Sequence, residues 1–202
     1  MSVTMRSLVG MALLASLAAP GQAAATTVNV ALAANGGSAV ESSSSWGANA
    51  SLAIDGNTNG NFFSGSVTHT LDDPQAFWQV NLSKAASVAS VVVWNRTDCC
   101  GDRLSPFNLQ LFSGANPVAS FDNVTFAENV TAAGSSGMAF DLAGAVGDLV
   151  RIQLAGTNYL SLAEVQVFSE VTHAPLPGAL WLLGSALFAL PAVSRRRGRT
   201  TA

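Results

Sequence analysis

The sequence predicts an all-β protein, a β-sandwich of the jelly-roll type, and three observations support this fold class. Short apolar or alternating runs recur along the chain, most clearly at residues 76–82 and 107–112. Stretches rich in Gly, Ser and Asn separate these runs, as expected for turns between strands. No stretch between the two terminal segments shows a sustained helical period. Many short strands joined by polar turns are typical of sandwiches and jelly rolls.

The N-terminal segment, residues 1–25, is predicted to be a secretory signal peptide. It has a single cation, Arg6, then an apolar run, and it ends in small residues at Ala23–Ala25. This order of a basic start, an apolar centre and an A-x-A site is typical of cleaved signals. A first core helix is the alternative interpretation, but the run is short for one and the cleavage site argues against it.

The C-terminal segment, residues 174–202, is predicted to be an apolar helix outside the sandwich. An apolar run at residues 178–193 is followed directly by four arginines within residues 195–199. The run is slightly shorter than the roughly 20 residues that span a bilayer comfortably. A basic cluster on its far side suits a stop-transfer segment whose positive end stays in the cytoplasm. A buried C-terminal helix, the alternative, would not explain the arginines.

The charge distribution argues against a nucleic-acid partner. Only 10% of the 202 residues are charged, and 49% are hydrophobic. Between the terminal segments lie all 12 acidic residues, whereas the cations there are only Lys84, Arg96, Arg103 and Arg151. Such an acidic surface repels nucleic acid. Each remaining cation is therefore informative, and two of them lie close together.

The first part of the sandwich is predicted to be one strand followed by a long loop. Residues 28–32 alternate and predict a strand. Residues 33–61 are rich in Gly, Ser and Asn, and only Trp46 and the run at 51–54 interrupt them. A long irregular segment in a compact domain usually carries function or binds an ion.

The remaining strands follow at short intervals. Residues 76–82 predict a strand with one buried face, because Trp78, Val80 and Leu82 alternate with Phe77, Gln79 and Asn81. Residues 87–94 are almost wholly apolar and predict a second, separate strand in the centre of the sandwich. Further strands are predicted at 107–112, 118–121, 138–142, 149–154 and 163–168.

The polar turn at residues 96–103 holds the densest chemistry of the chain. It contains Arg96 and Arg103, whose planar guanidinium groups donate several hydrogen bonds and accept none. Asp98 lies between them and can hold a guanidinium in a fixed plane. Together with His69, the only histidine of the predicted sandwich, the arginines could donate to adjacent hydroxyls and the ring oxygen of one sugar. An ordinary surface ion pair between Arg96 and Asp98 is the alternative.

The same turn contains both cysteines of the chain, Cys99 and Cys100. In an exported protein, cysteines are expected to be oxidised. These two can bond to each other or bridge between chains, and free thiols are a further alternative. Zinc binding is disfavoured because adjacent thiolates lack the spacing of zinc sites. A disulfide between neighbours would stiffen the turn and offer a flat sulfur surface to the apolar face of a sugar.

His69, the triplet Arg96-Thr-Asp98, Arg103 and the cysteine pair together resemble the motif of the F-type lectins, or fucolectins, a group of discoidin-like sandwiches. The resemblance implies a discoidin-like β-sandwich over residues 28–169. Supporting matches run across most of that range, at Asp55–Asn57, Gly65–His69, Trp78–Val80, Asn95–Gly101 and Leu162–Val165.

The resemblance implies a fucose site made of eight residues. The polar ones would hydrogen-bond the hydroxyls and ring oxygen of an α-L-fucose unit, with Asp98 orienting the arginines. The apolar ones would pack against the ring and receive its C6 methyl group, although a plain core role is the alternative for the two phenylalanines. The eight residues are His69, Arg96, Asp98, Arg103, Cys99, Cys100, Phe62 and Phe63.

The resemblance also implies a structural calcium ion held by the long loop. Oxygen-only ligands of this kind suit Ca²⁺. The segment Asp55-Gly-Asn57 alone is equally consistent with an ordinary turn, but the distant Glu164 stands at a matching position. The implied ligands are the side chains of Asp55, Asn57, Ser66 and Glu164 and the carbonyls of Leu52 and Ala163.

The C-terminal segment resembles the PEP-CTERM sorting signal of Gram-negative bacteria. The shared features are a Pro-x-Pro element at 175–177, an apolar stretch that contains Trp181, and the arginines that follow. Leu176 stands where that signal usually has Glu. The resemblance implies recognition by an exosortase-type enzyme, removal of the segment, and anchoring to the membrane until that happens.

These observations favour a non-enzymatic, calcium-stabilised lectin that is exported to the cell envelope or exopolysaccharide matrix and binds fucosylated glycans or exopolysaccharide. A surface or matrix structural protein that binds a different glycan, or none, is the alternative. A glycosidase is disfavoured, because the sequence offers no convincing pair of carboxylates in an apolar setting. Asp98 and Asp102 both flank arginines, which would keep them ionised.

Overall fold

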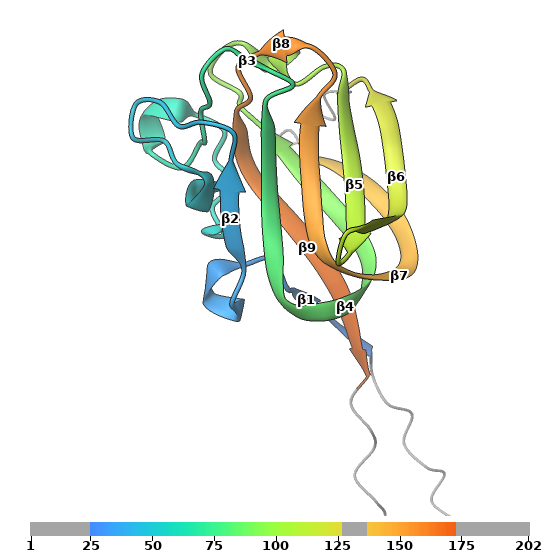
Figure 1. Cartoon of the computed structure of the whole chain (residues 1–202). Helices are drawn as coiled ribbons and strands as arrows, with labels where there is room; N and C mark the ends of the chain where they lie inside the picture. Colours follow the sequence, from blue (N-terminus) through green and yellow to red (C-terminus); the bar gives the residue numbers. More distant parts are fainter. Residues whose placement is uncertain (1–24, 127–136, 173–202) are drawn as a thin grey trace, which may run out of the picture. The chain divides into compact units, whose positions relative to one another are not determined.

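The computed structural model describes residues 25–126 and 137–172, which form a β-sandwich (Figure 1). Residues 1–24 of the predicted signal peptide and the whole predicted C-terminal segment lie outside these residues, whereas Ala25 begins β1. Among the residues described, no helix is both long and apolar enough to cross a membrane. The strands are β1 (Ala25–Asn29), β2 (Ser38–Glu41), β3 (Asp73–Pro74), β4 (Phe77–Asn95), β5 (Phe107–Ser113), β6 (Asn116–Val124), β7 (Gly137–Leu154), β8 (Thr157–Asn158) and β9 (Leu162–Thr172).

Two long strands, β4 and β7, connect the layers of the sandwich. They pair antiparallel from Phe77↔Gln153 to Trp94↔Gly137, and their register shifts between Asn81 and Ala86. The first part of β4 pairs with β2 and its second part pairs with β9. The sheet order is β1-β9-β4-β7-β5-β6, with β2 attached to β4. Each long strand thus contributes its two ends to opposite faces of the core.

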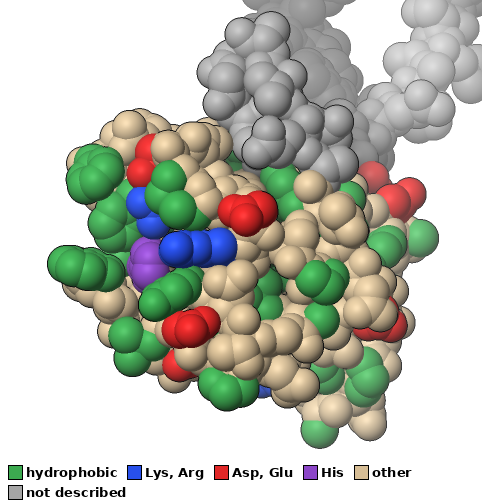
Figure 2. Space-filling view, turned by 90° about the horizontal axis from the view of Figure 1, so that it is seen from above, with side chains coloured by type: hydrophobic (Ala, Val, Ile, Leu, Met, Phe, Trp, Pro, Cys, Tyr) green, Lys and Arg blue, Asp and Glu red, His purple; other side chains and the backbone are tan. Residues whose placement is uncertain are grey.

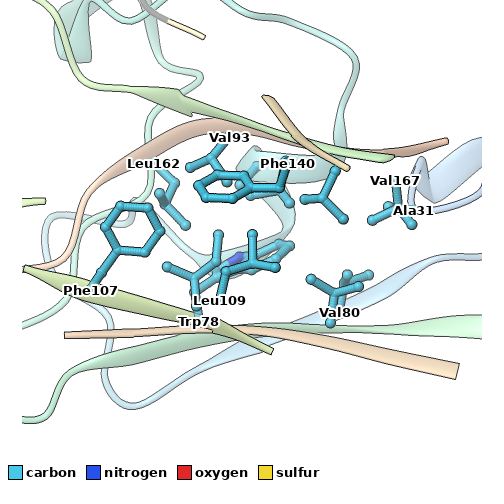
Figure 3. Close-up of a cluster of buried hydrophobic side chains, with 14 of the residues drawn as sticks. Ala31, Trp78, Val80, Val93, Phe107, Leu109, Phe140, Leu162 and Val167 are labelled. Carbon is cyan, nitrogen blue, oxygen red and sulfur yellow. The ribbon is translucent and has the colours of Figure 1, made fainter. Parts of the chain in front are cut away.

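The core lies between the layers, and its side chains are drawn in Figure 3. Trp78 and Val80 point inward from the first part of β4, and Val93 points inward from the second part. The indole of Trp78 also donates a hydrogen bond to the Ala50 carbonyl oxygen (2.9 Å), because a buried indole N–H needs an acceptor. This bond fastens the short 3₁₀ helix η2 (Ala50–Ile54) to the core.

The structure confirms the all-β sandwich and the inward face of residues 76–82. It corrects the number of strands, because segments 76–82 and 87–94 belong to the single strand β4, and segments 138–142 and 149–154 both belong to β7. In each strand a register irregularity lies between the two apolar segments.

The N-terminal part also differs from the prediction. Strand β1 begins before Val28 and ends at Asn29 rather than at Leu32. The predicted loop at 33–61 contains strand β2 and the 3₁₀ helices η1 (Ala33–Asn35) and η2. Strand β2 is short and only exposed or half-buried. It therefore carries no apolar signal that sequence reasoning can detect.

Backbone hydrogen bonds gather several loops at one end of the sandwich. The N–H of Thr68 donates to Leu162 O (2.8 Å), and that of Thr70 donates to Leu160 O (3.0 Å). Thr97 N donates to Gly60 O (2.8 Å), and a Cβ at Gly60 would lie only 2.6 Å from the Thr97 side chain. Glycine is therefore required where the long loop approaches the turn after β4.

The half-buried Glu41 of β2 makes the stability of this fold depend on pH. Burial raises the pKa of Glu41 to about 7, and the nearby Ser44 side chain opposes only part of this effect. A raised folded-state pKa means that the folded chain holds a proton that the unfolded chain releases. Stability should therefore fall as pH rises from about 4.5 to about 7.

We expect Glu41→Gln to increase the unfolding free energy at pH 8 by about 1–2 kcal/mol, after allowance for partial exposure, and to change it little at pH 4.5. Urea melts of both proteins at the two pH values measure this. Glu170→Gln, on an exposed carboxyl, is the control. Equal gains at both pH values would contradict the role assigned to Glu41.

Candidate functional site

An open depression of about 330 Å³ lies at the end of the sandwich where these loops meet. Figure 2 shows a histidine and Lys/Arg side chains gathered on this face, with hydrophobic side chains around them. All the predicted sugar-contacting residues except Asp98 line the depression, together with one residue that was not predicted to take part. The lining residues are Trp46, Phe62, Phe63, His69, Arg96, Cys99, Cys100 and Arg103.

A two-bond ion pair between Arg96 and Asp98 lies at the base of the site. Arg96 Nε donates to Asp98 Oδ1 and Nη2 donates to Oδ2, both at 2.8 Å. Their side chains are only 9% and 13% exposed, so this is not an ordinary surface ion pair. The hydrogen bond from Arg96 is the largest of the effects that lower the Asp98 pKa to about 2, so the carboxylate stays ionised at neutral pH.

The same pair positions the first aromatic side chain. Asp98 Oδ1 also accepts the backbone N–H of Phe62 (3.0 Å), which begins the 3₁₀ helix η3 (Phe62–Ser64). The Arg96 guanidinium carbon lies 4.5 Å from the centre of the Phe62 ring, within reach of a cation–π contact. Asp98 therefore lies outside the depression but sets the positions of two residues that line it.

His69 is held by its own backbone neighbour. Its Nδ1 lies 2.6 Å from Thr70 O and must donate to it, because a carbonyl oxygen can only accept. Burial lowers the pKa of His69 below its ordinary value of 6.5, and the charges of Arg96 and Arg103 add to this, whereas the Thr70 contact opposes it. In the resulting neutral ring, Nε2 is an acceptor.

Tyr159, which sequence reasoning missed, supports two of the polar residues. Its ring centre lies 4.7 Å from the guanidinium carbon of Arg103 and 5.4 Å from the centre of the His69 ring. It is the only tyrosine in the chain, but nothing else in its sequence context signals this role. Contacts between residues so far apart in sequence become visible only in the folded chain.

The two cysteines form a disulfide with each other, and neither is free. Their Cα atoms are 3.8 Å apart. Cys100 has a positive φ of 60° and precedes the 3₁₀ helix η4 (Gly101–Arg103), which brings Arg103 to the depression. The side-chain amide of Asn95 donates to Gly101 O (2.8 Å) and ties this helix to the end of β4.

Phe62 and Phe63 differ in their surroundings. Phe62 is half-buried beneath Arg96, whereas Phe63 is 87% exposed. Their rings meet edge to face, with centres 5.8 Å apart. Neither residue belongs to the buried core, so the alternative of a plain core role applies to neither.

Four of the predicted calcium ligands, Asp55, Asn57, Ser66 and Glu164, lie close together. Ser66 Oγ donates to Asp55 Oδ2 (2.7 Å) and lies 3.3 Å from the carbonyl oxygen of Asn57. Glu164 is completely buried, and its Oε2 accepts the Gly56 N–H at 3.3 Å. Its Oε1 has no hydrogen-bond partner among the residues that the structure describes.

Leu52 and Ala163 are close to this oxygen cluster in sequence, the first in η2 and the second immediately before Glu164 in β9. Only Asp55 and Glu164 contribute carboxylates, and within residues 25–126 and 137–172 no three His, Cys, Asp or Glu side chains form a metal-sized group. Burial raises the pKa of Glu164 to about 7, and the charge of Asp55 raises it further, against hydrogen bonds from the Gly56 and Asp55 backbone.

Comparisons with known proteins identify relatives of this sandwich. The family described as "NedA-like, galactose-binding domain" matches residues 52–152. Fucolectin-6 of Anguilla japonica is 35% identical over 122 residues, which are 58% of this chain and 62% of that protein. This chain therefore matches less than two thirds of the length of that relative.

Two solved structures are also similar. A fucose binding module of Streptococcus pneumoniae is 34% identical, with a TM-score of 0.64, and the match covers 71% of this chain and 96% of the module. The lectin domain of lectinolysin, solved in complex with Lewis B antigen, is 31% identical, with a TM-score of 0.63 and coverage of 71% and 98%.

The matched range includes the oxygen cluster up to Ser66, the His69 segment and the whole 96–103 turn. The solved modules match this chain over nearly their whole length. The chain therefore belongs to the NedA-like, galactose-binding family of discoidin-like sandwiches, and its β-sandwich is an F-type lectin, or fucolectin, domain.

Proposed function

We propose that this protein is a lectin that binds terminal α-L-fucose in the depression lined by His69, Arg96 and Arg103. The observation that carries the proposal is the convergence of two guanidinium groups and one imidazole on the same space, beside a disulfide and two aromatic rings. Relatives whose printed names are fucolectin and fucose binding module support the choice of sugar.

Different side chains would bind different parts of the sugar. Asp98 occupies Nε and Nη2 of Arg96, so the remaining N–H groups of Arg96 and those of Arg103 are available to donate to sugar oxygens. Nε2 of His69 would accept a hydrogen bond from a sugar hydroxyl. The disulfide and Phe62 and Phe63 offer apolar surface to the ring and to its C6 methyl group, which a 6-deoxy sugar presents in place of a hydroxyl.

The chemistry of the depression favours binding over catalysis. None of its lining residues is a carboxylic acid. Asp98 is held ionised and engaged by Arg96, so it is not available as a general acid. Glu41 and Glu164, whose pKa values are raised to about 7, do not line the depression.

We further propose that Asp55, Asn57, Ser66 and Glu164, with the carbonyls of Leu52 and Ala163, hold a structural calcium ion. The residues fit such an ion, because the donors are all oxygens and a buried carboxylate oxygen of Glu164 otherwise has no partner in the described part of the chain. The ion would supply positive charge between two neighbouring carboxylates and so stabilise the loop that carries Phe62.

Export to the cell envelope or exopolysaccharide matrix completes the proposal. Its support is the sequence of residues 1–25 and 174–202, which predicts a signal peptide and a membrane segment processed by an exosortase-type enzyme. The partners would be fucosylated glycans or exopolysaccharide. One open site binds weakly by itself, so many copies on a surface would be needed for firm attachment.

We expect Arg96→Lys to lower the affinity for fucose at least about tenfold, because a lysine cannot both reproduce the two-bond contact with Asp98 and donate to the sugar. Reduced retention on a fucose column measures this loss. Arg151→Lys is the matched control: Arg151 also stacks on a phenylalanine ring, at 4.9 Å from Phe77, but lies outside the depression. Full retention of the Arg96 variant would argue against this site.

Burial lowers the pKa of His69 below the ordinary histidine value of 6.5, so the ring stays neutral near pH 7. Fucose affinity should therefore be constant near pH 7 and weaken only when the pH falls below 6.5. Protonation would turn the accepting Nε2 into a donor and add positive charge beside two arginines. Calorimetric titrations with methyl α-L-fucoside between pH 8 and pH 4.5 measure this dependence. An affinity that rises on acidification would mean that His69 binds as a donor.

Removal of calcium with EDTA should lower the melting temperature by several degrees, because it leaves the carboxylates of Asp55 and Glu164 close together without a cation. Added Ca²⁺ should restore it. The Glu164→Gln variant serves as the control, since EDTA should change its melting temperature much less. An unchanged melting temperature of the wild-type protein in EDTA would rule out the calcium site.

A further inference from the structure

Arg151 lies at the centre of one face of the sandwich, away from the depression. The face belongs to the front sheet, which consists of β2, the first part of β4, the second part of β7, β5 and β6, side by side in Figure 1. Arg151 of β7 pairs with Gln79 of β4 on one side and with Gln110 of β5 on the other. The residues before and after each of these three are buried in the core, so the three side chains point outward.

The positions around Arg151 on this face are uncharged. Two rows adjoin it on β4, β7 and β5, and their side chains are amides, phenylalanines and one leucine. None of the 12 acidic residues of the chain occupies these positions. Charged residues normally lie on exposed surfaces, so a patch of amides around one arginine is unusual in so acidic a domain. The six residues are Phe77, Asn81, Asn108, Phe112, Leu149 and Gln153.

The guanidinium of Arg151 is held in place without being neutralised. Its Nε and Nη2 both donate to Gln79 Oε1, the first at 2.9 Å. Its central carbon lies 4.9 Å from the centre of the Phe77 ring and 6.0 Å from that of the Phe112 ring. Among the residues that the structure describes, no carboxylate pairs with it. A neutral amide therefore fixes the orientation of the group and leaves its full charge.

The acidic residues of the front sheet are directed or bound elsewhere. Glu41 of β2 lies on the core side of its strand. Asp148 Oδ1 accepts the N–H of Gly114 in the turn between β5 and β6 (3.0 Å). Asp122 Oδ2 of β6 accepts the hydroxyl of Ser120 (3.4 Å). The positive charge at the centre of the face is thus available to a ligand from outside.

We propose that the front sheet binds an acidic polysaccharide, with Arg151 contacting the carboxylate of a uronic acid unit. This inference goes beyond the fucose site and does not rest on it. Gln79 uses only one N–H of Nη2, so Nη1 and the second N–H of Nη2 remain to bind a carboxylate through two parallel hydrogen bonds. The surrounding amides can both donate to and accept from sugar hydroxyls.

The extent and charge of the face favour an extended polymer with sparse charges. Five strands about 4.8 Å apart cover roughly 20 Å, which is more than one sugar unit occupies. A nucleic acid carries a phosphate at every nucleotide and is bound by several cations, whereas the rows around Arg151 offer one. Carboxylates separated by neutral hydroxyls match a single arginine among amides.

Calorimetry with a galacturonic acid hexamer and with its fully methyl-esterified form tests the carboxylate contact, because only the acid form is charged. We expect the wild-type protein to bind the acid hexamer at least about tenfold more tightly than the ester, since charge-assisted hydrogen bonds are the stronger ones. Arg151→Gln should bring this ratio close to one. Arg103→Gln, which removes the same charge from the depression, is the matched control and should leave the ratio unchanged.

Fucose binding separates this inference from the proposed function. Arg151→Gln should keep the wild-type affinity for methyl α-L-fucoside, because Arg151 does not line the depression, whereas Arg103→Gln should lose it. If Arg151→Gln does not unfold cooperatively, Arg151→Lys replaces it. A lysine keeps the charge and the apolar stem but cannot form the two parallel bonds, so this variant should lose most of the preference for the acid form.

Three results would overturn the polysaccharide site and leave the fucose site intact. The first is a wild-type ratio near one, and the second is a ratio that survives in the Arg151 variants or falls equally in Arg103→Gln. The third is a wild-type dimer in light scattering that Arg151→Gln dissociates, because the face would then bind a second copy of the chain.

Discussion

The ion pair between Arg96 and Asp98 is the interaction on which the rest of the site depends. Both side chains are largely buried, so each needs its partner, because an unpaired buried charge costs several kcal/mol. Asp98 has a third bond, to the Phe62 backbone, and Arg96 lies on the Phe62 ring. One carboxylate thereby sets the plane of a guanidinium and the start of η3. The direction of the Arg96 donors and the position of the apolar Phe62 ring are therefore fixed together.

Around this pair, the sandwich supplies rigid ends for otherwise irregular loops. The turn at 96–103 begins where β4 ends, and Tyr159 and Glu164 flank the start of β9. His69 is tied by its backbone to the turn that carries Trp46. Binding residues on loops can be precise when such hydrogen bonds hold them to a packed scaffold. The depression is thus built by segments that are distant in sequence and share one end of the fold.

The oxygen cluster around Asp55 and Glu164 is a second polar centre of the fold. Asp55 is exposed, but it places its charge near the completely buried Glu164, whose ionised form is unfavourable unless a cation compensates. The raised pKa of Glu164 is one sign of this, and its unpartnered Oε1, judged against the described residues, is another. In the proposed function, a bound cation therefore stabilises the loop that carries Phe62.

Much of this molecule could be predicted from local chemistry in the sequence. The alternation at Trp78 and Val80 indicated the sandwich, because residue type and spacing along one strand are visible directly. The resemblance of His69, Arg96 and Arg103 to the motif of a known family indicated the site. The sequence could not show that β4 and β7 are continuous across their irregularities, since pairing across the sheet decides this.

Contacts between distant segments decided the remaining features. Tyr159 supports His69 and Arg103 only because the start of β9 lies beside their loops. Nε2 of the neutral His69 ring can accept a hydrogen bond because folding places Nδ1 where it donates to Thr70 O. The sequence by itself therefore determined which chemical groups are available and the class of fold that carries them. The tertiary structure alone decided their direction and protonation, because both depend on neighbours that folding brings together.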